Sequence, residues 1–187
     1  MNTKNLVALA LLVGMGAVLH AVVPGFFLGM KPDMMLTMMF LGIVLFPDKK
    51  SVLLLAIVTG VIAALTTTFP GGQIPNIIDK PIAAIVFLGL FTALKRYQKS
   101  IVSVAILTAV GTIVSGVAFL GSALLIVGLP GPFTALFAAV VLPAAAVNTI
   151  VMVVLYPVAL SIVKRTKLND STVVITQNNG TNRKLID

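Results

Sequence analysis

The chain has 187 residues, of which 59% are hydrophobic and 10% are charged, with a formal net charge of +8. Because about a quarter of the residues of a soluble domain are charged, this composition predicts an integral membrane protein. Most basic residues lie in short loops beside apolar runs, which is typical of membrane anchoring and argues against nucleic acid as a partner. The absence of cysteine excludes disulfides, thiolate nucleophiles and cysteine-ligated metal centres, and we expect no cofactor.

Six apolar runs predict an all-α, polytopic membrane protein, a bundle of about six spans of roughly 20 residues each. The first run is too long for the apolar region of a signal peptide, so we expect it to be retained. The second is short for a full span. Prolines 32 and 81 are interpreted as the first helical residues of the second and fourth spans. The expected spans are 6–23, 32–46, 52–68, 81–94, 101–120 and 143–163.

The stretch 121–142 is almost wholly apolar but contains Pro130 and Pro132. A seventh helix is the alternative, but prolines remove backbone donors within such a run. A seventh span would also move the basic cluster at 164–167 to the side opposite the other basic loops. We therefore expect a folded or re-entrant outer loop that packs against protein.

The distribution of charge predicts the orientation of the bundle. With six spans, most basic residues share one side, which predicts a multi-pass protein of the cell membrane with both termini cytoplasmic. Residues 1–167 then form one membrane domain in contact with the lipid bilayer, and the polar residues 168–187 form a disordered cytoplasmic tail.

The sequence offers no energy source of its own. It contains no G-x-x-x-x-G-K-[ST] phosphate loop, so we expect no ATP hydrolysis by this chain. No charged residue lies inside a predicted span, where proton-coupled carriers keep their relay groups. We therefore expect an energising partner, while sodium coupling through backbone carbonyls stays open.

Two charged clusters, Lys-Pro-Asp at 31–33 and Asp-Lys-Pro at 79–81, stand at the predicted outer face. Charge costs roughly 2.5–3.5 kcal/mol at the centre of a bilayer, so paired charges at one face indicate a function. A lysine can pair with a ligand carboxylate while an aspartate accepts from its ammonium, which predicts a site for a small zwitterion with an apolar part. The alternative is helix capping by the aspartate at 33 and snorkelling of the lysines. The binding interpretation requires both clusters to converge on one pocket.

Amide side chains accompany these clusters. Gln73 and Asn76 can orient a ligand by directed hydrogen bonds, although an ordinary turn is the simpler explanation. Asn148 lies about five residues beyond Pro143, roughly 7.5 Å below the outer end of the last span. It either bonds to a neighbouring helix or lines a cavity open to the outside, and we favour the cavity. His20 is interpreted as a satisfied interfacial residue.

Apolar side chains near the clusters offer an adaptable wall for an aromatic group, although each one is by itself more typical of packing. They are Met30, Met34, Met35, Met38, Met39, Phe26, Phe27 and Phe69.

Small residues recur four apart in the first span, where Ala10 pairs with Gly14 and Ala17 with Ala21. Such a face permits close contact between helices. It is either a docking surface for another membrane subunit or a face that packs within the chain.

Nearly the whole apolar region, about residues 4–167, resembles the tryptophan-transporter S component of energy-coupling-factor (ECF) transporters. The resemblance is clearest in GMKPDMM at 29–35 and TTTFPGGQIPNIIDKP at 66–81. It implies a six-helix substrate-capture protein that binds tryptophan and works with a transmembrane coupling subunit and two cytoplasmic ATPase subunits. It also implies a ligand site near the outer face, covered by the loops after spans one, three and five.

The resemblance assigns ligand contacts to residues of both clusters and of the last span. With the amide at 73 added, the expected substrate-binding residues are Lys31, Asp33, Gln73, Asn76, Asp79, Lys80 and Asn148. It also assigns partner docking to Ala10 and Gly14, where glycine departs from the family's Ala-x-x-x-Ala pattern. A self-sufficient ion-coupled carrier for a small zwitterionic or aromatic solute is the main rival. A membrane enzyme is the least supported, because few candidate acids or bases reach the spans.

Overall fold

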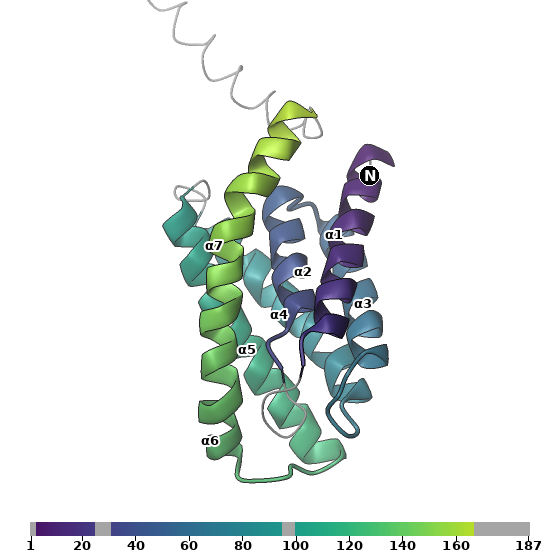
Figure 1. Cartoon of the computed structure of the whole chain (residues 1–187), viewed down its shortest axis with the longest axis vertical. Coiled ribbons are helices and arrows are strands. Elements are labelled where there is room, and N and C mark those ends of the chain that lie inside the picture. The colour runs from purple at the N-terminus through teal and green to yellow at the C-terminus, as the bar shows by residue number, and fades with distance from the viewer. Residues whose placement is uncertain (1–2, 25–30, 95–99, 167–187) are drawn as a thin grey trace, which may run out of the picture.

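The computed structural model describes residues 3–24, 31–94 and 100–166, which form a bundle of helices (Figure 1). The expectations for Phe26, Phe27, Met30 and the polar tail fall outside these residues. The helices are α1 (Thr3–Val22), α2 (Met34–Leu45), α3 (Lys49–Leu65), α4 (Gln73–Ala93), α5 (Ile101–Ile126), α6 (Phe133–Leu136), the π-helical turn η2 (Phe137–Val141) and α7 (Leu142–Arg165). The last three form one continuous helix of 33 residues.

Four of the described helices are long and apolar enough to cross a membrane: α1, α4, α5 and the continuous helix 133–165. Helix α3 has 17 residues and α2 has 12. The all-helical membrane architecture expected from the composition is therefore confirmed.

Helix α2 forms the centre of the bundle. Every one of its residues except Val44 is buried, and it packs against α1, α3, α4, α5 and α7. A helix that is apolar on all sides requires such an enclosed position. Close packing depends on glycine, because a Cβ at Gly42 would lie 2.7 Å from a methyl group of Leu55 on α3.

Aromatic rings join α2 to α4 and α5. The rings of Phe40 and Phe87 are stacked with centroids 4.2 Å apart, and a Cβ at Gly111 of α5 would lie 2.8 Å from the Phe40 ring. A second, smaller core of Phe69, Leu120, Ala123, Leu136 and Val141 lies toward the end of the bundle where α5 meets α6.

Helix α4 begins eight residues earlier than the sequence predicted. It starts at Gln73, so Pro81 lies inside the helix and not at its first position. Pro75 occupies the first turn, where a missing N–H has no intrahelical partner to lose, and only Pro81 removes an internal hydrogen bond. Consequently Asp79 and Lys80 lie within an apolar helix, and the expectation of no charge inside a span is wrong.

The starts of α2 and α3 are fixed by aspartate caps. Asp33 Oδ1 accepts a hydrogen bond from the Leu36 N–H at 3.0 Å, and Asp48 Oδ1 accepts one from the Ser51 N–H at 3.0 Å. Such caps satisfy backbone donors that have no intrahelical acceptor. Helix α2 therefore begins after Asp33 and not at Pro32.

The stretch 121–142 is mostly helical, so the expectation of a re-entrant loop is wrong. Helix α5 continues to Ile126 and the chain is helical again from Phe133, leaving both Pro130 and Pro132 in a short turn. Gly128 adopts φ +84° in this turn, and its N–H donates to the Ala123 carbonyl at 2.9 Å. The wide turn η2 lies directly before Pro143, at the point where proline cannot supply the regular α-helical hydrogen bond.

Candidate functional site

A fully buried lysine links the two charged clusters. Lys80 Nζ lies 2.7 Å from Asp33 Oδ2 and 2.8 Å from Asp79 Oδ1, and it donates to Asn76 Oδ1 at 3.2 Å. Asn76, Asp79 and Lys80 share one face of α4 because they are spaced three and four residues apart. The two clusters therefore converge, as the binding interpretation of the sequence required.

Each carboxylate of this cluster is also held by a second element. Asp79 Oδ2 accepts a hydrogen bond from the Ser115 hydroxyl of α5 at 2.9 Å. Asp33 Oδ1 caps α2 and lies 3.4 Å from Nδ1 of His20 on α1. Burial alone would raise the pKa of Asp33, but the Lys80 ammonium and His20 outweigh it and hold this pKa well below its usual range. Asp33 is therefore a carboxylate at neutral pH.

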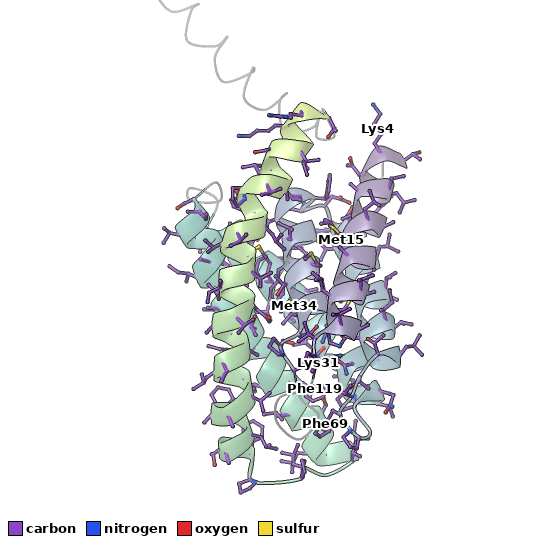
Figure 2. The ribbon with its side chains drawn as sticks, viewed as in Figure 1. Lys4, Met15, Lys31, Met34, Phe69 and Phe119 are labelled. Carbon is purple, nitrogen blue, oxygen red and sulfur yellow. The ribbon has the colours of Figure 1, made fainter. Side chains whose placement is uncertain are left out.

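A cavity of about 100 Å³ lies against this cluster, well above the roughly 10–15 Å³ that one water molecule needs. Its walls come from α1, α2, α4, α5, the helix 133–165 and the segment between α3 and α4. The lining residues are His20, Lys31, Asp33, Leu36, Thr67, Thr68, Phe69, Asn76, Asp79, Thr112, Ser115, Gly116, Phe119, Leu120, Val140, Val141 and Ala144. Figure 2 shows Lys31, Phe69 and Phe119 in the same part of the bundle, far from Lys4 at the start of α1.

The same cavity also has an aromatic and apolar wall. Phe69 meets Phe119 edge to face, with ring centroids 5.5 Å apart. Gly71, two residues after Phe69, adopts φ +72°, and a Cβ there would lie 2.3 Å from Val127. The segment that carries Phe69 is thus pressed onto the end of α5. An aromatic pair of this kind offers a surface for a further ring.

Lys31 lies at the edge of the cavity and is partly exposed. Its ammonium donates a hydrogen bond to the backbone carbonyl of His20, near the end of α1. Partial burial lowers the pKa of Lys31, and the nearby Asp33 opposes this shift. A cation at this position also interacts favourably with the helix dipole.

The predicted amide residues have three different positions. Asn76 lines the cavity, where its Nδ2 donates to the Gly72 carbonyl at 2.8 Å. Gln73 is exposed and is not part of the lining. Asn148 is buried behind the lining, and its Nδ2 lies 3.4 Å from the hydroxyl oxygen of Thr112, which does line the cavity. Ligand contact by these residues stays a prediction.

The methionines expected in an aromatic-binding wall lie elsewhere. The four described methionines of α2 are at most 5% exposed, pack in the core and are absent from the cavity lining; they are Met34, Met35, Met38 and Met39. Their thioethers therefore fill the core, which is the commoner use of methionine in an apolar helix.

Helix α5 supplies site residues that the sequence analysis missed. Thr112, Ser115 and Gly116 line the cavity, and Thr108, Thr112 and Ser115 form a buried stripe of hydroxyl side chains. The spacing of 108, 112 and 115 places them on one helix face, which was the available signal. Gly116 matters by its size, because a Cβ there would lie 2.4 Å from Val141 in η2.

The two faces of α1 differ. Ala10 and Gly14 are exposed, and a Cβ at Gly14 would meet no atom within 4 Å. Gly16 on the other face is buried against α2, where a Cβ would lie 3.1 Å from Met38. Close packing within the chain therefore uses Gly16 and leaves the Ala10–Gly14 face uncovered.

These features define a polytopic helical membrane protein with a part-enclosed cavity that is lined by both charged and aromatic side chains. The chain belongs to the tryptophan transporter TrpP family, whose pattern matches residues 2–165. This confirms the resemblance found in the sequence and places the chain in a family of transporters, not enzymes.

Individual relatives agree with this assignment. A probable tryptophan transport protein of Bacillus subtilis (strain 168) is 57% identical over 171 residues, which are 91% of this chain and 99% of the relative. Proteins of the same description are 45% identical over 159 residues in Clostridium acetobutylicum (83% and 91% covered) and 37% identical over 176 residues in Clostridium perfringens (89% and 97% covered). No solved structure matches the chain.

Proposed function

We propose that the chain is the substrate-capture subunit of an ECF-type transporter and that it binds tryptophan in the cavity. The observation that carries this proposal is that the Asp33–Lys80–Asp79 cluster and the Phe69–Phe119 pair meet at one cavity, which both carboxylates and both rings line. A zwitterionic amino acid with an aromatic ring needs both surfaces: charged groups for its backbone and apolar area for its ring.

We further propose that all six helical segments span the cell membrane, with 133–165 as the sixth. Helix α2 is short, but the other helices enclose it, so its apolar side chains are buried in protein and need no full contact with lipid. Lys4 lies in the first turn of α1, Lys49 and Lys50 begin α3, and Lys164 and Arg165 end α7. The start of α1 and the end of α7 lie at the same end of the bundle (Figure 1), and Lys4 is far from the cavity residues Lys31, Phe69 and Phe119 (Figure 2). The positive-inside rule then places both termini in the cytoplasm and opens the cavity outward.

The exposed face of α1 is the proposed docking surface for the transmembrane coupling subunit, with Ala10 and Gly14 at its centre. Small residues there permit the backbones of two helices to approach closely. Because the chain has no phosphate loop, the two ATPase subunits of this proposal supply the energy.

Ligand retention tests the proposal directly. The chain contains no tryptophan, so indole fluorescence released from a purified, desalted and then denatured sample comes from bound ligand. We expect released tryptophan, and saturable binding of labelled tryptophan to the ligand-free protein. A pure sample that binds another solute and not tryptophan would overturn the substrate assignment.

One observation favours a second candidate, a self-sufficient ion-coupled carrier. Asp79 and Lys80 lie inside an apolar helix, where carriers keep the charged groups that couple transport to ions. Reconstitution of the chain alone into vesicles separates the two functions. Uptake driven by a proton or sodium gradient supports the carrier, whereas binding without uptake supports the capture subunit.

A further inference from the structure

The ammonium of Lys80 has no hydrogen bond to offer a ligand. A lysine carries three donors, and those of Lys80 are met by Asp33, Asp79 and Asn76. The side chain is 0% exposed and does not line the cavity. Lys80 is therefore a positioning residue that holds two carboxylates, and it leaves Lys31 as the lysine of the two clusters that lines the cavity.

The cavity has a negative floor. Asp33 and Asp79 both line it, and they share one buried ammonium, so the floor holds one carboxylate charge more than its own cation balances. Asp79 is buried and the side chain of Asp33 is only 19% exposed, so water does not solvate this charge fully and it needs a partner.

His20 gives independent support for a missing partner at the same place. It is 5% exposed and lines the cavity, and its Nδ1 has no hydrogen-bond partner among the described residues although Asp33 is 3.4 Å away. A buried polar atom without a partner beside two carboxylates marks an unfilled hydrogen-bonding position.

The edge of the cavity is positive by contrast. Lys31 is the cation there, partly exposed to solvent and bonded to a backbone carbonyl that a ligand carboxylate can replace as its acceptor. The cavity thus runs from a buried negative floor to a partly exposed positive edge. A zwitterion has its lowest energy with its ammonium toward the floor and its carboxylate toward the edge.

We propose, building on the proposed function, that the ligand amine binds at the Asp33–Asp79 floor and dominates recognition, while its carboxylate binds near Lys31 and contributes less. The difference follows from burial, since a charge pair away from water interacts more strongly than an exposed pair. The site is accordingly selective for aromatic amines over aromatic acids.

Competition between two halves of the ligand tests this orientation. The full chain in lipid nanodiscs is loaded with labelled tryptophan and titrated with tryptamine, which lacks the carboxylate, or with indole-3-propionate, which lacks the amine. We expect tryptamine to displace the label at a concentration at least about tenfold lower than indole-3-propionate does. Equal potency, or stronger displacement by indole-3-propionate, overturns the orientation. Absence of tryptophan binding would overturn the proposed function as well.

Two variants assign the ends of the ligand to residues. In Asp79→Asn the isosteric amide oxygen still accepts from Lys80 or Ser115, but the excess negative charge is gone. We therefore expect the ratio of the potency of tryptamine to that of indole-3-propionate to fall toward one. In Lys31→Gln we expect the ratio to rise, because only the acid loses a partner. A ratio is insensitive to the fraction of folded protein. An unchanged ratio in both variants overturns the proposal, and if Asp79→Asn does not fold, the Lys31→Gln ratio decides.

Discussion

The floor and the wall of the cavity are built by opposite means. In the floor, every donor of Lys80 has an acceptor, and the carboxylates are held by groups of α2, α4 and α5. The wall consists of Phe69, Phe119, Gly116 and Val141, which touch only through van der Waals and ring contacts. A buried polar network in which every donor of its central lysine is used permits few arrangements, whereas apolar side chains repack at modest cost. Under the proposed function, the floor fixes the position of the ligand and the wall sets the size of the ring that fits.

The largest effect is expected from breaking the floor. Lys80→Met leaves two buried carboxylates without their cation, which costs about 3–5 kcal/mol of stability. We expect a lower midpoint of thermal unfolding in detergent and loss of tryptophan binding. Lys50→Met is the matched control, because Lys50 is exposed at the other end of the bundle. An unchanged unfolding midpoint in Lys80→Met would show that the network does not hold the site together.

Narrowing the wall comes next. In Gly116→Val the new side chain meets Val141 at a Cβ distance of 2.4 Å, so the helices must shift or the cavity must shrink. Overpacking of this kind costs about 1–3 kcal/mol, and we expect tryptophan affinity to fall by tenfold or more. In Gly121→Ala the added Cβ meets no atom within 4 Å, so binding should be unchanged. Equal affinities in the two variants would contradict a wall that sets ligand size.

Removing one aromatic ring from the wall is expected to have a smaller effect on affinity. Phe119→Leu loses the edge-to-face pair with Phe69, worth about 0.5–1.5 kcal/mol beyond burial. We expect a several-fold loss of tryptophan affinity with the stability little changed. Phe133→Leu is the control, because Phe133 stacks on Phe137 at 6.4 Å outside the cavity lining. If both variants lose affinity alike, the effect is one of general packing.

The smallest effect on binding is expected from the outer face of α1. Gly14→Leu points away from the bundle, so tryptophan binding should be retained while transport by the assembled complex is lost if this face docks a partner. Gly16→Leu, which faces Met38, should impair folding and with it both activities. Transport by Gly14→Leu at the native rate would exclude this face as the docking surface.

Much of this arrangement followed from the sequence. The apolar runs predicted the helices, and the charge pairs at 31–33 and 79–81 predicted a shared cluster, because isolated charges are costly in a membrane. The start of α4 was misplaced because proline is favoured at the first helical position and removes a hydrogen bond in the interior, so Pro81 indicated a helix start. Tertiary contacts decide between the two, since Lys80 reaches Asp33 only from an already helical segment.

The contribution of α5 was harder to foresee. Thr112, Ser115 and Gly116 are ordinary packing residues for a membrane helix, and only the position of Asp79 gives Ser115 a specific role. The prediction that the methionines form a wall for an aromatic ligand was wrong for a different reason. Their polarizable side chains suit both a ligand wall and a core, and the enclosure of α2 by five helices selects the core.

The widened turn η2 holds the outer part of the last helix in a particular rotational phase. A π-type turn holds about one residue more than an α-helical turn, and each residue of an α-helix turns the chain by about 100°. Winding 137–141 into regular α-helix at the same chain length would therefore rotate Phe133–Leu136 by about that angle relative to α7. Leu136, now 1% exposed, would leave the small core that closes this end of the bundle. The wide turn thus sets which side of Phe133–Leu136 faces the end of α5.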